Sequence, residues 1–186
     1  MNLLNLSNSN LRNCVHAIIR QLNADGFKPH YIVGVTRGGL IPAVMLSHYL
    51  NVPMHTLKVS LLEGSDDDCE SNLWMSEDAF GYVPKEEQEI IKSRWDVSKK
   101  KNILIVDDIN DTGATFNWIK KDWQSSCLPN EDFAWEHVWK NNVRFATLVD
   151  NESSNFHDVK YSGMSINKTE DPDIWVNFPW ESWWED

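Results

Sequence analysis

The sequence NILIVDDINDTGAT, residues 102–115, places an apolar run, two acids and a turn-rich segment in direct succession. The run Ile103 to Val106 consists of β-branched and leucine residues, which predicts a strand buried on both faces of a parallel sheet. Asp107 and Asp108 follow where such a strand would end. The small and hydroxyl residues after them suit a backbone that curls around an anion at the start of a helix. The plain alternative is a buried strand followed by solvated acids and a helix cap.

This segment resembles the ribose-phosphate-binding motif of type I phosphoribosyltransferases. The resemblance implies that Asp107 and Asp108 hold the ribose hydroxyls of phosphoribosyl pyrophosphate (PRPP) and, mainly through PRPP, a Mg²⁺ ion. It also implies that the 5′-phosphate is bound by the loop that follows, formed by Asp111, Thr112, Gly113, Ala114 and Thr115. The resemblance also makes Asp111 the candidate general base near purine N7, where a carboxylate can accept the base proton. Capping of the turn and helix is its other candidate role.

A second strand–turn–helix pattern lies upstream. Tyr31 to Val35 predicts a strand, and the apolar residues between positions 40 and 50 predict a helix. The stretch VTRGGLIP, residues 35–42, resembles the pyrophosphate-binding loop of the 6-oxopurine branch, especially the xanthine-guanine enzymes. By this resemblance, pyrophosphate is bound by Thr36, Arg37, Gly38 and Gly39. Taken alone, the same glycine-rich turn could be purely structural.

The tail DIWVNFPWE, residues 173–181, resembles the C-terminal end of xanthine-guanine phosphoribosyltransferases. The resemblance implies that Trp175 stacks on the purine and that the backbone near Val176 reads the edge of the base. The alternative is that a tryptophan-rich tail simply closes the core. We interpret Trp180, Trp183 and Trp184 as packing or interface residues.

The chain departs from the family pattern after the strand at Ala146 to Val149. Related 6-oxopurine enzymes commonly have a lysine-proline pair there, with the lysine on the purine 6-oxygen, whereas this chain has Asn151 and Glu152. Asn151 can still donate an amide hydrogen bond to the base, but the fixed positive charge is missing. Asp150 or Glu152 could instead accept hydrogen bonds from an amino-bearing base.

Composition and charge restrict the possible functions. A chain of 186 residues with 41% hydrophobic residues suits one domain, residues 1–186. The net charge of −11 argues against a nucleic-acid-binding surface. No apolar run is long enough to span a bilayer, which predicts a cytoplasmic protein without a membrane partner. Cys14, Cys69 and Cys127 form no CxxC motif, so reduced structural thiols are favoured over a disulfide framework or zinc site.

Three segments look like additions to this domain. Residues 62–84 have no sustained helical pattern and predict a flexible acidic loop, either a flap over the reaction or a passive insertion. The three aspartates at 66–68 lack the spacing of a calcium loop. Residues 125–142 read as an inserted segment in which Trp135 and Trp139 serve the core or a subunit contact rather than a base platform. Residues 151–186 predict a C-terminal base-recognition hood.

The expected fold is α/β, the type I phosphoribosyltransferase fold, with a mainly parallel sheet flanked by helices and ligand at the carboxyl ends of the strands. The remaining elements are predicted as a first helix through Leu11 to Leu22, strands at Pro53 to Leu61 and Val143 to Val149, and a short helix within Lys85 to Trp95.

The resemblance implies an enzyme of purine salvage, a homodimer or homotetramer that transfers the 5-phosphoribosyl group of PRPP to a purine. Guanine, xanthine or hypoxanthine is favoured, and the products are a nucleoside 5′-monophosphate and pyrophosphate. One alternative is a PRPP-sensing regulatory protein without productive transfer. Another is a structural α/β protein that does not bind PRPP.

Overall fold

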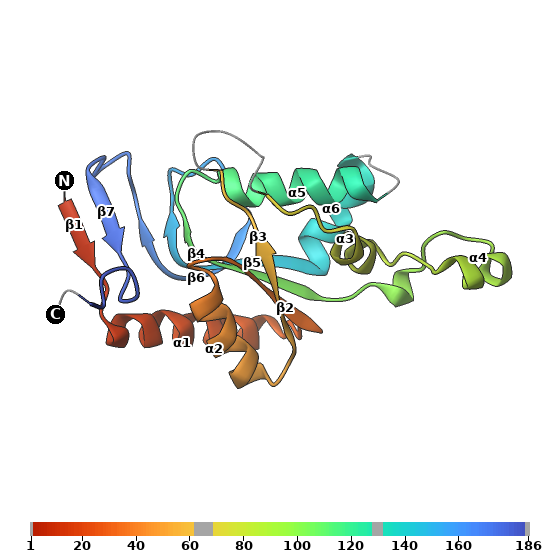
Figure 1. Ribbon diagram of the computed structural model, residues 1–186, viewed down its shortest axis with the longest axis horizontal. Coiled ribbons are helices and arrows are strands. Elements are labelled where there is room, and N and C mark those ends of the chain that lie inside the picture. Colours follow the sequence, from red (N-terminus) through yellow and green to blue (C-terminus); the bar gives the residue numbers. More distant parts are fainter. Residues whose placement is uncertain (1, 62–68, 128–131, 185–186) are drawn as a thin grey trace.

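A parallel sheet forms the centre of the protein, which this computed structural model describes over residues 2–61, 69–127 and 132–184. In chain order the elements are β1 (Asn2–Asn5), α1 (Asn8–Asp25), β2 (Tyr31–Thr36), α2 (Leu40–Leu50), β3 (Met54–Lys58), α3 (Leu73–Phe80), α4 (Lys85–Ile91), η2 (Val97–Lys99), β4 (Ile103–Asn110), α5 (Ala114–Ser126), α6 (Asp132–Asn141), β5 (Val143–Asn151), β6 (Val159–Ile166) and β7 (Ile174–Asn177). Five strands pair in parallel in the order β3-β2-β4-β5-β6, and β1 pairs in parallel with β7 (Figure 1). The predicted α/β architecture is confirmed.

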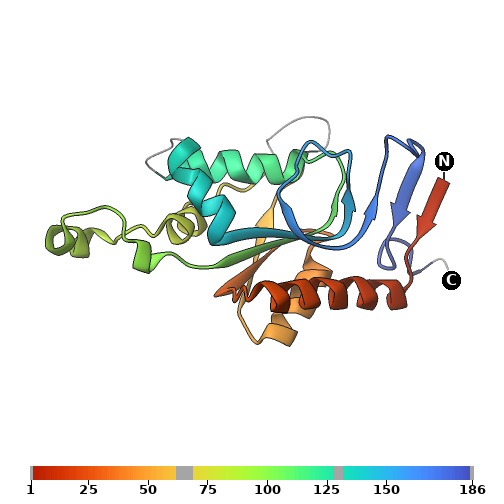
Figure 2. The ribbon, with the colours of Figure 1, turned by 180° about the vertical axis from the view of Figure 1, so that it is seen from behind.

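Alternate side chains of the central strands build two core layers on opposite faces of the sheet. Helices α1 and α2 cover one face, while α3, α5 and α6 lie over the other (Figures 1 and 2). Ile32 and Leu104 belong to the first layer and Val33 and Ile105 to the second, and all four are fully buried. Burial on both faces explains why these strands read as continuous apolar runs.

The N-terminal segment joins the hood, which the sequence did not indicate. Strand β1 pairs with β7, with Leu3 opposite Trp175, so the two ends of the chain lie together (Figure 1). The predicted hood of residues 151–186 was too long, because β6 is the fifth strand of the main sheet. Polar residues and Gly163 interrupt the apolar pattern of this edge strand. Gly163 lies so close to Cys14 of α1 that a Cβ atom there would overlap it.

The predicted loop at 62–84 contains the helix α3. Its first turn is capped by Asn72, whose side-chain oxygen accepts a hydrogen bond from the Met75 nitrogen at 3.1 Å. Met75, Ala79 and Phe80 are buried, so the expectation of a segment without helical pattern was wrong for residues 73–80. Residues 62–68, including the three aspartates, lie outside the described ranges, and the flap role stays a prediction. The short helix predicted within 85–95 is α4, which projects from the body (Figure 1).

The segment at 125–142 packs its tryptophans inward, as predicted. Trp135 is fully buried in α6 and stacks on Trp139 with ring centroids 5.2 Å apart. Both belong to the core layer beneath α5 and α6. Residues 128–131 lie outside the described ranges. None of the helices in the described part of the chain is long and apolar enough to cross a bilayer.

Candidate functional site

The acid pair lies where the sheet opens between β2 and β4. Pairing of these strands ends at Gly34 and Val106, whereas β4 stays paired with β5 as far as Asn110. Asp107 and Asp108 therefore lie inside β4, not beyond its end as the sequence suggested. The turn after β2 fills the opening. Gly38 is packed so tightly against the Asp108 carboxylate that a Cβ atom would overlap it.

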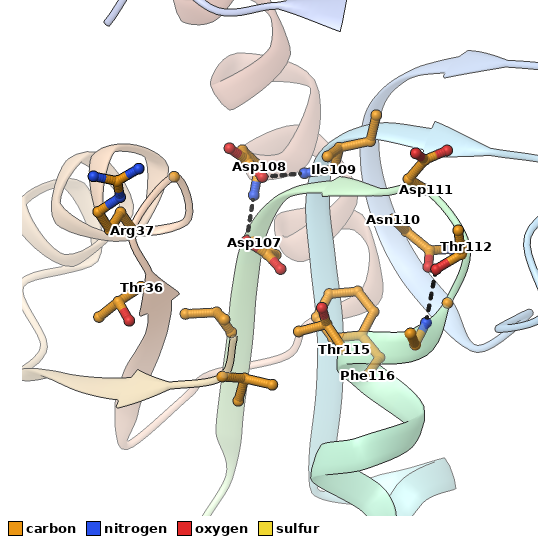
Figure 3. A pocket seen from close by; sticks show the side chains of 15 residues that line it. Thr36, Arg37, Asp107, Asp108, Ile109, Asn110, Asp111, Thr112, Thr115 and Phe116 are labelled. Atoms are coloured by element: carbon orange, nitrogen blue, oxygen red, sulfur yellow. Dashed lines mark hydrogen bonds between the residues drawn. The ribbon is translucent and has the colours of Figure 1, made fainter. Parts of the chain in front are cut away.

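A cavity of about 250 Å³ lies at the carboxyl ends of β2 and β4. Thr36 and Arg37 lie on one side of it and Thr115 on the other, with Asp107 and Asp108 between them (Figure 3). Its lining contains every residue predicted to bind pyrophosphate, ribose or 5′-phosphate except Gly39. Gly39 is buried behind the turn, where an added Cβ would lie 2.5 Å from the Val106 oxygen. The tertiary fold therefore unites two motifs about 70 residues apart.

Burial raises the pKa of both carboxyl groups of the acid pair. The pKa of Asp107 is raised well above its usual range, first by burial and then by the charge of Asp108. Burial also raises the pKa of Asp108 to about 6, although its carboxylate accepts a hydrogen bond from the Ile109 nitrogen at 2.8 Å. The nearby Glu181 adds to this rise. A cation at the pair would relieve this repulsion.

The pair fits Mg²⁺ as part of a larger coordination shell. Magnesium prefers oxygen ligands and is commonly held by one or two carboxylates together with substrate phosphates and water. Within the described ranges, no group of three or more histidine, cysteine or acidic side chains is arranged to hold a metal by itself. Asp107 and Asp108 are therefore suited to a magnesium ion that arrives with a phosphorylated ligand.

The loop at 111–115 forms an anion cradle at the N-terminus of α5. Gly113 has φ +87° and directly precedes the helix, a conformation that favours glycine. A Cβ atom there would lie 2.5 Å from the Phe156 nitrogen. The Thr112 hydroxyl accepts a hydrogen bond from the Ala114 nitrogen at 3.3 Å. The helix N-terminus and its hydroxyl groups thus face the cavity, a favourable position for a phosphate.

Asp111 carries a partner that the sequence did not reveal. The Lys168 ammonium lies 2.7 Å from one Asp111 carboxylate oxygen and 2.8 Å from the other. The same nitrogen is 6.0 Å from the centre of the Trp175 ring. Lys168 follows the end of β6 by two residues, so it lies at the carboxyl edge of the sheet. A sequence pattern that identified β6 as a sheet strand would have indicated that Lys168 lies at the same edge of the sheet as Asp111, because both residues follow the ends of parallel strands.

The side chain of Asn151 is hydrogen-bonded to the backbone of both Asp111 and Lys168. Its side-chain nitrogen donates to the Asp111 carbonyl at 2.8 Å, and its side-chain oxygen accepts from the Lys168 backbone nitrogen at 3.1 Å. The same oxygen accepts two hydrogen bonds from Ser153, and the residue is only 5% exposed. Asn151 therefore connects the backbone at Asp111 with that at Lys168, and its direct contact with the base stays a prediction. Asp150 is likewise engaged, accepting from the Asn110 amide at 2.8 Å.

Trp175 and Val176 occupy the hood strand β7. The Trp175 side chain is 53% exposed, whereas that of Val176 is buried. Hydrogen bonds from Asn2 to the Asp173 carbonyl and from Leu6 to the Asn177 carbonyl mark the odd-numbered residues of β7 as the partners of β1. Because successive residues of a strand direct their backbone groups to opposite edges, the Val176 backbone points away from β1. An exposed ring and an outward backbone are compatible with the predicted base contacts.

The C-terminal tail adds a second wall beyond the turn. A cavity of about 560 Å³ is bounded by Arg37 and Asp108 on one side and by Trp180, Glu181 and Trp184 on the other. Trp180 stacks on Phe178 with centroids 4.8 Å apart, as expected of a packing residue. No local sequence signal marks Glu181 as a site residue, and only the fold brings it near the acid pair.

Comparison with known proteins agrees with this geometry. A model of the phosphoribosyl transferase domain matches residues 6–183. Xanthine phosphoribosyltransferase 1 of Saccharomyces cerevisiae is 22% identical over 200 residues, covering 95% of this chain and 88% of the relative. Hypoxanthine-guanine phosphoribosyltransferase of Schizosaccharomyces pombe is 26% identical over 169 residues, covering 84% of this chain and 78% of the relative.

The fold is also shared with a solved structure. Purine phosphoribosyltransferase from Pyrococcus horikoshii superposes with a TM-score of 0.63 at 22% identity, over 98% of this chain and 96% of that one. Because the domain match extends over nearly the whole chain, the protein belongs to the type I phosphoribosyltransferase family, with xanthine and hypoxanthine-guanine phosphoribosyltransferases among its distant homologues.

Proposed function

We propose that the protein is a Mg²⁺-dependent purine phosphoribosyltransferase that converts PRPP and a 6-oxopurine into a nucleoside 5′-monophosphate and pyrophosphate. The observation that carries the proposal is the cavity in which the turn after β2, the acid pair and the loop before α5 meet. This arrangement offers separate places for the three parts of PRPP. Guanine, xanthine or hypoxanthine is the favoured acceptor.

Each part of PRPP has a chemically suitable position. The 5′-phosphate lies against the backbone and hydroxyl groups of 111–115, where the helix N-terminus favours an anion. The ribose hydroxyls bind Asp107 and Asp108. The pyrophosphate binds Arg37, which lies across the cavity from Thr115 (Figure 3), and the backbone around Gly38. Bound Mg²⁺ would neutralise charge that accumulates on the departing pyrophosphate.

The transfer breaks one bond and makes another at the anomeric carbon. The bond to the pyrophosphate oxygen breaks and its electron pair leaves with pyrophosphate, while the purine ring nitrogen forms the new glycosidic bond. Arg37 stabilises the leaving group. Asp111, near purine N7, accepts the proton that the base loses as the new bond forms, and so acts as a general base. The exposed ring of Trp175 stacks on the purine, and the Val176 backbone reads its edge.

The biological setting belongs to the same proposal. We place the enzyme in purine salvage in the cytoplasm, as a homodimer or homotetramer. Ile41, Val44 and Tyr49 of α2 are 37, 38 and 57% exposed, which provides apolar surface for a subunit contact. Light scattering coupled to size-exclusion chromatography measures the assembly, and a monomer at micromolar concentration would refute this part.

A product assay tests the activity. The protein is incubated with PRPP and Mg²⁺ and, separately, with guanine, xanthine, hypoxanthine or adenine, and nucleotide formation is measured. An Asp111→Asn variant retains the shape of the side chain but replaces the basic carboxylate with an amide, so product formation should fall at least 100-fold. PRPP binding without any nucleotide product would favour the regulatory alternative, and absence of both would overturn the proposal.

A further inference from the structure

We infer that Lys168 is the residue that selects a 6-oxopurine, and that it does so by leaving Asp111 when the base enters. The inference rests on the proposed function and assigns a residue that the family resemblance does not. The resembled enzymes carry their lysine after the strand that corresponds to β5. Here that position is Asn151, and the cation comes from the end of the neighbouring strand β6.

The position of the Lys168 ammonium joins the two groups that a purine must meet. It contacts both oxygens of the Asp111 carboxylate, at 2.7 and 2.8 Å, and it lies 6.0 Å from the centre of the Trp175 ring. A base stacked on Trp175 with its ring nitrogen near Asp111 therefore has an ammonium group at its edge. The side chain is 23% exposed, so a ligand can reach it.

The backbone of Lys168 is fixed while its side chain can reorient. Asn151 accepts a hydrogen bond from the Lys168 nitrogen and donates one to the Asp111 carbonyl. The buried amide thus sets the separation of the lysine and the aspartate. Four rotatable side-chain bonds allow the ammonium group to move from the carboxylate to a ligand without moving this frame.

The chemistry of lysine determines which base it favours. An ammonium group has three donors and no acceptor, so it can bind the 6-oxygen of guanine, xanthine or hypoxanthine but not the 6-amino group of adenine. The ion pair also occupies the Asp111 carboxylate before the base arrives. When the purine carbonyl accepts a hydrogen bond from the Lys168 ammonium, that bond replaces the contact with Asp111, and Asp111 becomes free to accept the ring proton. The 6-amino group of adenine cannot accept this hydrogen bond, so Lys168 stays on Asp111. Selection therefore acts on binding and on turnover together.

The test uses Lys168→Ala and Lys168→Arg, with Lys160→Ala as a control because Lys160 is an exposed lysine of β6, the strand that precedes Lys168. Loss of a hydrogen bond from a charged donor corresponds to about a 10- to 100-fold rise in KM for a 6-oxopurine. KM for PRPP should change less than twofold, and adenine should be used no worse than before. The arginine variant should recover part of the guanine-over-adenine preference, and the control should behave as the unaltered protein.

Equal losses with PRPP, guanine and adenine would indicate a merely structural role and overturn the inference, as would a change in the guanine KM below threefold. Calorimetric binding of GMP and AMP reads the same selectivity without turnover. If the unaltered protein makes no nucleotide but Lys168→Ala weakens GMP binding and leaves AMP binding unchanged, the proposed activity fails while the selector role stands. Equal binding of both nucleotides before and after the substitution would refute that role.

Discussion

Replacing Asp108 with asparagine should stabilise the protein at neutral and alkaline pH while weakening PRPP binding. Asparagine keeps the oxygen that accepts the hydrogen bond from the Ile109 nitrogen and removes the charge that burial and Glu181 disfavour. It also removes the charge that raises the pKa of Asp107. The negative charge of Asp108 is therefore expected to lower the stability of the ligand-free protein at neutral pH.

The magnitude follows from the pKa of Asp108, which folding raises from 3.8 to about 6. Because the folded carboxyl binds its proton more tightly than the unfolded one, protonation stabilises the folded state. That contribution is fully present below about pH 4 and is lost as the pH rises through about 6. One pKa unit corresponds to about 1.4 kcal/mol, so the variant should gain about 3 kcal/mol at pH 8 and less than about 1 kcal/mol at pH 4.

Urea denaturation at several pH values between 4 and 8 measures this difference directly. Asp173→Asn, which removes an exposed carboxylate, is the control and should change the free energy of unfolding by less than about 0.5 kcal/mol at every pH. A variant gain that does not depend on pH, or a loss of stability at pH 8, would refute the electrostatic reasoning. Saturating PRPP and Mg²⁺ should stabilise the unaltered protein more than the variant.

Three further substitutions test other parts of the structure. Gly113→Ala should cost about 1–3 kcal/mol in thermal denaturation, because φ is +87° and the new methyl group would meet the Phe156 nitrogen; an unchanged melting temperature would contradict this conformation. Trp135→Ala should cost about 3–5 kcal/mol in urea denaturation, whereas Phe133→Ala, at a 79% exposed position of the same helix, should cost less than about 1 kcal/mol; similar losses in both would argue against the packing of α6. Arg37→Ala should raise the calorimetric Kd for PRPP about 10- to 100-fold through the loss of a charged donor, and unchanged affinity would remove Arg37 from the pyrophosphate site.

The local units of the fold could be predicted because their signals are local. The apolar run of β4, the two glycine-containing turns and the spacing of Leu11 to Leu22 each lie within a short stretch of chain. Helix α3 was not predicted, because its buried residues Met75, Ala79 and Phe80 lie among acidic and polar neighbours in the sequence. Strand β6 was not predicted, because an edge strand with half-exposed faces lacks a continuous apolar run.

The sequence by itself determined the α/β architecture and the cavity residues contributed by two strand-end turns, since parallel strands bring such turns to one edge of a sheet. Only the tertiary structure decided that β1 completes the hood and that Lys168 meets Asp111 beside Trp175. The first contact joins opposite ends of the chain, and the second joins residues 57 positions apart. Neither leaves a local pattern, because a single lysine or a four-residue strand acquires its role from partners that folding alone brings near.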